Sequence, residues 1–334
     1  MKYAIPMIYN TRPMIPKNEK QDISLIPVTG LLGSGIQQSL SPLLHEAAGE
    51  TTGRMTDYHL FDIAPKNVDG FLKQVIEFGE VAGFNVTIPY KEVMFGRIEA
   101  VHEEAKAVGA VNTIAVRGEH LFGYNTDKPA FSRSIIASLK EGDHPENGWK
   151  VIVLGAGGGA RAVVRSVLDL GIADELDIMS RSEDRRVCLL LAIQEECDQK
   201  GIKLTQHDWL DWEKLEPAKR TMIINATPLG MADKNGIILR PSVKIPDGLL
   251  YGSDLVFDLN YNPPITGLME VAREVGLQAV GGGGLLIEQA VLSRSIWFGD
   301  GREDEERATM VAVYSTWASK LARNNFDGNS GEDL

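Results

Sequence analysis

Two spacings of apolar residues alternate along most of the chain. Short apolar runs bounded by turn residues predict strands at residues 23–32, 58–63, 83–88, 109–116, 121–127, 151–154, 175–179, 204–209, 222–225, 255–258 and 278–280. Apolar positions three and four residues apart predict a helix that begins near residue 42 and others at residues 68–79, 99–108, 128–139, 162–170, 185–200, 266–276, 285–298 and 303–323. A short glycine turn after residue 116 makes the fourth and fifth strands a candidate hairpin. The remaining alternation of strands and helices predicts an α/β protein with a buried parallel sheet.

One strand leads directly into a glycine-rich turn. Residues 151–154 are all apolar, and the spacing Gly155-x-Gly157-x-x-Ala160 then fits the dinucleotide-binding fingerprint. Glycine permits the tight turn and the approach of a pyrophosphate to the backbone, and alanine permits close packing of the helix on the strand. The unpaired N–H groups of the helix would then face the phosphates. The alternative is a tight strand-to-helix turn that binds nothing.

The end of the next strand bears on which dinucleotide would bind. In this arrangement an acid at that point binds the ribose 2′-hydroxyl of NAD, but residues 179–182 contain no acid. They contain Arg181, whose guanidinium suits the 2′-phosphate of NADP, and we therefore expect NADP. Glu183 and Asp184 lie close enough in the sequence to leave NAD open. Arg185 is either a further positive charge at the site or a solvated helix residue.

Composition narrows the class of protein. A length of 334 residues favours two domains, and a net charge of −12 argues against a nucleic-acid partner. No apolar run approaches the ~20 residues of a membrane helix, and residues 1–20 lack the apolar core of a secretory signal. Cys188 and Cys197 form neither a metal knuckle nor a CxxC pair, and the six histidines show no ligand spacing. We therefore expect a cytoplasmic protein without a metal site, and we leave open whether it is a monomer or a homodimer.

Several polar residues allow two interpretations. Ser41 precedes Pro42 and could simply cap the helix that follows. Asp127 has the same alternative, and Lys91 could be a solvated surface charge. Four consecutive glycines at 281–284 permit a hinge or the close approach of a cofactor, or else form a flexible linker. The local sequence alone favours the plain structural interpretation of Ser41 and Lys91.

Seven motifs in a fixed order bear on these alternatives. They are Ser39-Leu-Ser41-Pro42, Asn85-Val-Thr87-Ile-Pro89-Tyr-Lys91, Gly109-Ala-Val-Asn112-Thr113, Gly123-Tyr-Asn125-Thr-Asp127, Gly155-Ala-Gly-Gly-Gly-Ala-Arg-Ala162, Asn225-Ala-Thr-Pro-Leu-Gly-Met231 and Asp258-x-x-Tyr261-x-Pro263-x-x-Thr266-x-Leu268, followed by Gln289. Over roughly residues 26–300 this series resembles the shikimate dehydrogenase family, including its quinate/shikimate dehydrogenase branch.

The resemblance implies roles for individual residues. Lys91 and Asp127 would be the catalytic acid–base pair. The substrate carboxylate would be bound by Ser39 and Ser41. Its ring hydroxyls would be held, together with Asp127, by Thr87, Asn112, Tyr261 and Gln289. The cofactor would be bound by Gly155, Ala156, Gly157, Gly158, Gly159, Ala160, Arg181, Asn225, Thr227, Met231 and Gly282.

The resemblance also implies a fold and an activity. An N-terminal α/β substrate-binding domain would comprise residues 25–127 and 285–323, and a Rossmann-type, doubly wound dinucleotide-binding domain would comprise residues 128–284. An extension would occupy residues 1–24 and a disordered tail residues 324–334. The expected activity is the NADP-dependent interconversion of 3-dehydroshikimate and shikimate. An NAD-dependent quinate/shikimate dehydrogenase is the nearest alternative, and a non-catalytic dinucleotide-binding regulator is an alternative of another class.

The chain departs from the family pattern at a few positions. Gln38 stands where many relatives have histidine and Gly35 where many have proline, so the approach to the two serines can differ. Ser180-Arg181-Ser182 replaces Asn-Arg-Thr but keeps the arginine on which the NADP prediction depends. Gly159 replaces an alanine, which is a mild change.

Overall fold

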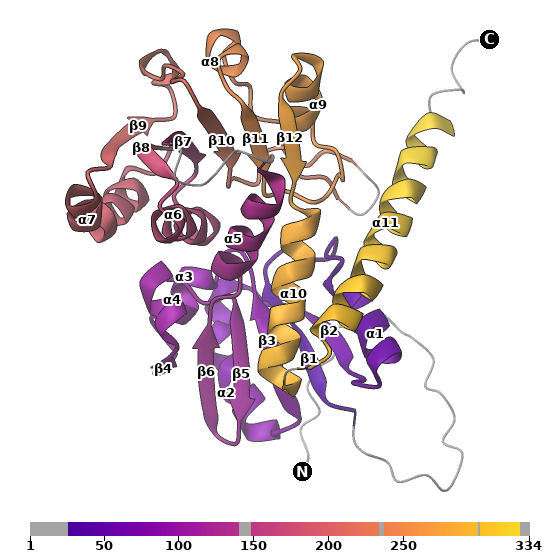
Figure 1. Ribbon diagram of the computed structural model, residues 1–334. Coiled ribbons are helices and arrows are strands. Elements are labelled where there is room, and N and C mark those ends of the chain that lie inside the picture. The colour runs from indigo at the N-terminus through magenta and orange to yellow at the C-terminus, as the bar shows by residue number, and fades with distance from the viewer. Residues whose placement is uncertain (1–25, 140–147, 234–236, 300, 328–334) are drawn as a thin grey trace, which may run out of the picture.

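The structure is a computed structural model that describes residues 26–139, 148–233, 237–299 and 301–327. It contains two six-stranded sheets. One sheet comes from the N-terminal part of the chain and the other from its middle, and long helices run between and beside them (Figure 1). This arrangement confirms the predicted α/β class. The predicted extension at residues 1–24 lies outside the described residues.

The first sheet has the strand order β2-β1-β3-β5-β6-β4. Its strands are β1 (Val28–Gly33), β2 (Asp57–Asp62), β3 (Val81–Val86), β4 (Ala100–Val101), β5 (Thr113–Arg117) and β6 (His120–Tyr124). β1 pairs in parallel with β2 and β3, and β5 pairs antiparallel with β3 and β6, which confirms the predicted hairpin. The connections contain η1 (Pro65–Asn67), α1 (Ser41–Thr52), α2 (Val68–Phe78), α3 (Lys91–Phe95) and α4 (Glu103–Val108).

Helix α2 covers one face of this sheet with its predicted apolar stripe. Val68, Phe71, Leu72 and Val75 share a buried cluster with Phe84 of β3. The rings of Phe71 and Phe84 meet edge to face with centroids 5.5 Å apart, an orientation that aromatic pairs favour. This packing fixes β3, whose carboxyl end leads into the candidate site.

The helix predicted at residues 99–108 is wrong at its start. Ala100–Val101 instead forms the two-residue strand β4, which pairs in parallel with β6. His102 then caps α4, since its ring nitrogen accepts a hydrogen bond of 3.4 Å from the Glu104 N–H. A two-residue strand is too short to leave a period in the sequence, which is why the pattern missed it.

The second sheet is parallel throughout, with the order β12-β11-β10-β7-β8-β9. Its strands are β7 (Trp149–Leu154), β8 (Ala173–Ser180), β9 (Lys203–Asp208), β10 (Thr221–Asn225), β11 (Leu255–Asp258) and β12 (Gln278–Gly281). The connections contain α6 (Gly158–Leu170), α7 (Glu183–Lys200), η2 (Trp212–Lys214), α8 (Asp247–Tyr251) and α9 (Gly267–Glu274). The central position of β7 places its glycine-rich turn where the strand order reverses, the point at which such sheets bind ligands.

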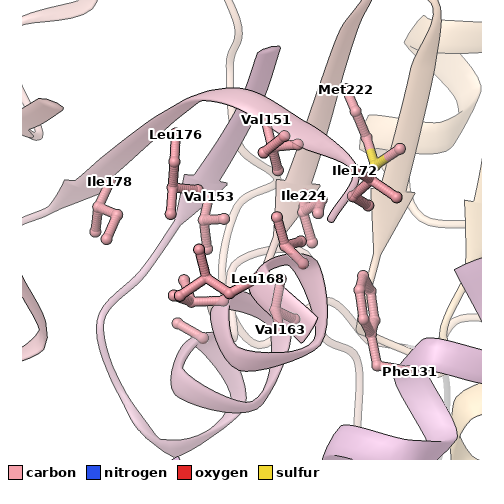
Figure 2. Packing of buried hydrophobic residues seen from close by; sticks show 14 of the residues in the cluster. Phe131, Val151, Val153, Val163, Leu168, Ile172, Leu176, Ile178, Met222 and Ile224 are labelled. Atoms are coloured by element: carbon pink, nitrogen blue, oxygen red, sulfur yellow. The ribbon is translucent and has the colours of Figure 1, made fainter. Parts of the chain in front are cut away.

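Successive residues of β7 enter cores on opposite faces of the second sheet. Val151 and Val153 face α6 and pack with Leu168 (Figure 2). Ile152 and Leu154 belong to a separate buried cluster on the other face. The strand is therefore buried on both sides, as its continuous apolar run predicts.

Two helices join the two sheets, and a third packs beside them. α5 (Asp127–Ser138) leads from β6 toward the second sheet, and α10 (Gly283–Phe298) returns from β12 and lies beside α5 (Figure 1). The end of α10 is tied to the first sheet, because the Trp297 indole N–H donates to the Ile114 carbonyl at 2.9 Å. α11 (Glu303–Asp327) then packs along α1 and α10.

The predicted C-terminal tail is partly wrong, since α11 continues to Asp327 and so includes residues 324–327. Residues 328–334 lie outside the described residues. The first turn of α11 contains four acidic residues, which stabilise the helix because its dipole attracts negative charge at the N-terminus. Within the described ranges, no helix is both long and apolar enough to cross a lipid bilayer.

Candidate active site

Lys91 and Asp127 meet at the edge of the first sheet. The Lys91 Nζ lies 2.6 Å from Asp127 Oδ2, and the two side chains are only 20% and 13% exposed. Lys91 begins α3 just beyond β3, and Asp127 is the first residue of α5 just beyond β6. Thr126, and not Asp127, occupies the N-cap position of α5. The solvated-lysine and N-cap interpretations of these two residues are therefore wrong.

The glycine-rich turn of the second sheet packs against this ion pair. A Cβ atom added to Gly158 would lie 3.0 Å from the Cβ of Lys91, closer than real side chains normally approach. Gly158 is also the first residue of α6, so the helix that the fingerprint predicts begins four residues earlier than the apolar stripe indicates. The lack of a side chain at Gly158 thus brings the candidate cofactor loop onto the candidate catalytic lysine.

Other features of the turn fit a dinucleotide phosphate. Gly155 has φ +120°, a conformation that side chains strain, so the tight turn requires glycine. The N-cap residue Gly157 provides no side-chain cap, which leaves the first N–H groups of a 13-residue helix available. Ala160 is fully buried, consistent with close packing of α6 on the sheet. Ala156 is also buried, and Gly159 is half-buried in the first turn of α6.

Two arginines lie at the carboxyl end of β8. Arg181 follows β8 directly and is exposed. Ser182 caps α7 by accepting a hydrogen bond from the Arg185 N–H, and the Arg185 side chain reaches across to Glu92, with Nε 3.9 Å from Oε2. Glu183 is an exposed residue of the first turn of α7. Arg181, Glu183 and Arg185 are all exposed, and the Arg185 side chain approaches the glycine turn, because a Cβ atom on Gly157 would lie 3.9 Å from its Nη1.

Ser39 and Ser41 lie together at the start of α1. The Ser39 hydroxyl donates to the Ser41 hydroxyl at 3.2 Å. The N-cap residue of α1 is Leu40, and Ser41 is the first residue of the helix, so the capping interpretation of Ser41 is wrong. The Tyr261 hydroxyl hydrogen-bonds Ser39 and the Leu40 N–H, and burial raises the pKa of this tyrosine. The phenol therefore remains protonated beside the two serines at neutral pH.

A buried hydrogen-bond network fixes the amides behind these residues. Asn112 donates to the Thr126 hydroxyl at 2.9 Å and accepts from the Thr126 N–H at 2.7 Å, so its side-chain orientation is determined. Asn85 Nδ2 donates to Ser293 of α10 at 2.8 Å, while its Oδ1 accepts from the Tyr58 hydroxyl at 2.9 Å. The sequence analysis assigned no role to Tyr58 or Ser293. Ser293 follows Gln289 by four residues on α10, a helical spacing that could have indicated it.

Thr87 and Gln289 complete the predicted substrate residues. Thr87 lies one residue beyond β3, and its N–H donates to the Leu32 carbonyl at 2.9 Å. The Gln289 Nε2 donates to the Leu286 carbonyl of its own helix at 3.1 Å. Thr87 comes from the first sheet and Gln289 from the returning helix α10, so the two residues approach the site from different parts of the chain.

The remaining predicted cofactor residues have structural partners of their own. Asn225 is buried, accepts from the Thr227 hydroxyl at 2.6 Å, and donates to Asp258 at 3.0 Å. Burial raises the pKa of Asp258 to about 6. Met231 is half-buried beyond β10. Among these residues, Asn225 and Thr227 stabilise the turn after β10 whether or not a cofactor is bound.

The glycines at 281–284 do not form a flexible linker. Gly281 ends β12, Gly282 is the N-cap residue of α10, and the next two glycines form its first turn. A Cβ atom on Gly282 would overlap the Leu259 carbonyl, so this glycine permits close contact between two backbone segments. Among the described residues, no three histidine, cysteine or acidic side chains cluster as metal ligands would.

Comparisons with known proteins agree with this geometry. Residues 31–114 match the family model of the shikimate dehydrogenase substrate binding domain. The shikimate dehydrogenase (NADP(+)) of Methanopyrus kandleri is 34% identical over 275 residues, which cover 82% of this chain and 90% of that protein. A crystal structure of shikimate 5-dehydrogenase from Thermus thermophilus in complex with NADP(H) and shikimate is 28% identical, with a TM-score of 0.65 over 86% of this chain and 100% of that one. Quinate dehydrogenase from Corynebacterium glutamicum in complex with NAD is 26% identical, with a TM-score of 0.69 over 86% of this chain and 99% of that one.

Proposed function

The chain belongs to the shikimate dehydrogenase family, and from that premise we propose that it catalyses the NADP-dependent interconversion of 3-dehydroshikimate and shikimate. The observation that supports this most directly is the position of the Lys91–Asp127 ion pair against Gly158. A proton donor and a dinucleotide-binding turn are the two components that reduction of a ketone requires. The Methanopyrus relative named for this NADP-dependent activity supports the proposal.

The residues around the glycine turn fit a dinucleotide. The first N–H groups of α6 would hold its pyrophosphate, and the lack of a side chain at Gly157 would let it approach the backbone. Arg181 would pair with the 2′-phosphate, since a guanidinium binds phosphate through two parallel hydrogen bonds. When bound, NADPH supplies the hydride that the ketone carbon accepts. Its binding to this chain is an expectation from the turn, from Arg181 and from the family.

The proton is the part of the reaction that this chain would supply. As the ketone carbon gains the hydride, negative charge develops on its oxygen, and the Lys91 ammonium would donate a proton to that oxygen. Asp127 would orient Lys91 through their 2.6 Å contact and would accept a hydrogen bond from a neighbouring substrate hydroxyl. In the reverse direction the neutral Lys91 amine would take the hydroxyl proton as the hydride leaves.

The substrate would be oriented by residues from both ends of the chain. Ser39 and Ser41 would turn their hydroxyl hydrogens toward the substrate carboxylate, and Tyr261 would lie beside them. Thr87, Asn112 and Gln289 would contact the ring hydroxyls. Holding the reacting carbon close to both the hydride donor and Lys91 would account for a large part of the rate acceleration.

Steady-state rates with four substrate pairs test this proposal. Shikimate or quinate would be combined with NADP or NAD, and shikimate with NADP is expected to give the highest kcat/KM. A higher value with quinate and NAD would favour a quinate dehydrogenase. The similarity to the Corynebacterium enzyme supports this alternative. Binding of NADP without turnover of any pair would favour a non-catalytic regulator.

Other features of this proposal come from the sequence alone. A cytoplasmic location and a monomeric or homodimeric state remain predictions. The boundaries of the two domains, at residues 128 and 284, also remain predictions. Gel filtration with light scattering would measure the oligomeric state directly.

A further inference from the structure

Three segments of the chain meet where α10 begins. The backbone at residues 259–261 lies against Gly282, whose N–H donates to the Asn260 carbonyl at 3.0 Å. The lack of a side chain at Gly282 permits this approach, because a Cβ atom there would overlap the Leu259 carbonyl. The third segment is α11, which contributes Tyr314. We call the contact of these three segments the α10 junction.

Tyr314 closes the α10 junction with both its hydroxyl and its ring. The hydroxyl donates to the Tyr261 carbonyl at 3.0 Å. The ring stands over Gly283, where an added Cβ atom would lie 2.5 Å from two ring carbons. The ring also contacts Trp317, with centroids 5.4 Å apart. Burial raises the pKa of Tyr314 to about 12, so the phenol stays a hydrogen-bond donor at neutral pH.

The α10 junction supports two residues that the proposed function places on the substrate. Tyr261 extends from it toward Ser39, and Gln289 lies on α10 six residues beyond Gly283. Tyr261 and Gln289 both depend on Tyr314, because the Tyr314 side chain holds the Tyr261 backbone and covers the first turn of α10. The Lys91–Asp127 pair lies on other elements, α3 and α5, and Tyr314 makes no contact with it among the interactions of the described residues.

We propose that Tyr314 of α11 is a positioning residue for substrate binding, which acts by holding Tyr261 and the Gln289-bearing helix in place through the α10 junction. The proposal rests on the proposed function, since it concerns the substrate residues of that same site. Tyr314 itself would touch neither substrate nor cofactor. Its loss should therefore affect the binding of the acid substrate and leave the chemical step intact.

Tyr314→Phe removes only the hydroxyl and tests the hydrogen bond. Loss of one neutral hydrogen bond should raise KM for shikimate by roughly 2- to 12-fold. We expect kcat to change by less than about twofold and KM for NADP to stay unchanged. Tyr251→Phe, at an exposed tyrosine of α8, provides the matched control and should change none of these values. An unchanged KM for shikimate, or an equal loss in kcat and in both KM values, would overturn the proposal.

A double-mutant cycle tests the packing of the ring on Gly283. Gly283→Ala should lower Tm and raise KM for shikimate, because the new methyl group meets the Tyr314 ring. Tyr314→Ala creates room for that methyl group, so the same Gly283→Ala change should have little further effect in the Tyr314→Ala background. An equal effect of Gly283→Ala in both backgrounds would contradict the proposed contact.

The same measurements separate this inference from the proposed function. Unmodified protein that turns over no shikimate would overturn the proposed function and this inference with it. Normal turnover by the unmodified protein, together with a Tyr314→Phe variant of unchanged KM, would overturn the inference alone. Thermal unfolding of each variant shows whether a kinetic change reflects general loss of folding.

Discussion

The Lys91 ammonium lies 2.6 Å from the Asp127 carboxylate, although 36 residues separate the two in the chain. Three neighbouring strands of the first sheet bring them together, because β5 lies between β3 and β6. Lys91 follows β3 and Asp127 follows β6, and these two ends reach the same edge of the sheet as the Gly158 turn. The pair is therefore placed by strand order, and its proximity to the glycine turn makes it the candidate catalytic pair.

Lys91→Ala should reduce kcat much more than it weakens substrate binding. Loss of a positioned general acid typically costs about 10²–10⁴-fold in rate, and we expect a fall of that size in kcat with KM within a few-fold. Lys73→Ala, at an exposed lysine of α2, is the control and should leave both constants unchanged. A Lys91→Ala variant with near-normal kcat would show that the role assigned to Lys91 is wrong.

Arg181→Gln should weaken the enzyme's preference for NADP over NAD. A charge-assisted hydrogen bond contributes about 1.5–3 kcal/mol, so we expect KM for NADP to rise at least roughly 10-fold. KM for NAD should change little, because NAD lacks the 2′-phosphate. The control is Arg302→Gln. Arg302 is a surface arginine that directly precedes α11 and pairs with Glu305. Equal changes for the two cofactors would place the 2′-phosphate elsewhere.

Glu196 should make folding stability sensitive to acid. Its hydrogen bonds to Arg165 lower the pKa of this carboxyl from 4.5 to about 2 in the folded protein. The folded state therefore favours the charged form, and its stabilisation is present above pH 4.5 and lost as the pH falls toward 2. Because the side chain is 27% exposed, we discount the effect to about 1–2 kcal/mol. Urea denaturation of Glu196→Gln should show a flatter pH dependence in this window than the unmodified protein. The same slope in both proteins would contradict the effect.

Glu306→Ala should strongly destabilise the contact between α10 and α11. Arg294 and Glu306 are 0% and 1% exposed and lie 2.8 Å apart, so removal of Glu306 leaves a buried guanidinium without its counter-charge. Such a loss typically costs about 3–5 kcal/mol of unfolding free energy. Replacement of both residues by apolar ones, as in Arg294→Met with Glu306→Leu, should cost less than the single change. Chemical denaturation of the three proteins measures the difference, and the opposite order would contradict a buried ion pair.

Much of the fold was predictable because buried strands and amphipathic helices leave periods in the sequence. The apolar run at 151–154 indicated a strand buried on both faces, and the helical stripe at 68–79 indicated α2; both are confirmed. Elements without a period were missed or displaced. β4 has only two residues, α3 has five, and α6 begins in glycines that no apolar pattern includes.

Some residues of the candidate site were predictable from the sequence, and others were not. The motifs named Lys91, Asp127 and the glycine turn, but local sequence favoured a solvated Lys91 and a capping Ser41. Both local interpretations were wrong. Lys91 pairs with Asp127, which is distant in the chain, whereas Ser41 is the first residue of α1 and Leu40 is its N-cap residue. Tyr58 lies 27 residues from Asn85, and Ser293 lies 208 residues from it, yet all three share one buried network.

The sequence by itself determined the α/β class, the dinucleotide-type turn and the identity of the polar residues that the family motifs contain. Those properties depend on local period, on glycine conformation and on residue type, which neighbours along the chain specify. Only the tertiary structure decided that Lys91 pairs with Asp127, that Gly158 packs on Lys91, and that Tyr314 completes the α10 junction. Each of these contacts joins elements that are distant in the sequence and are brought together by strand order and helix packing. The spacing of residues within one segment does not specify how separate elements pack.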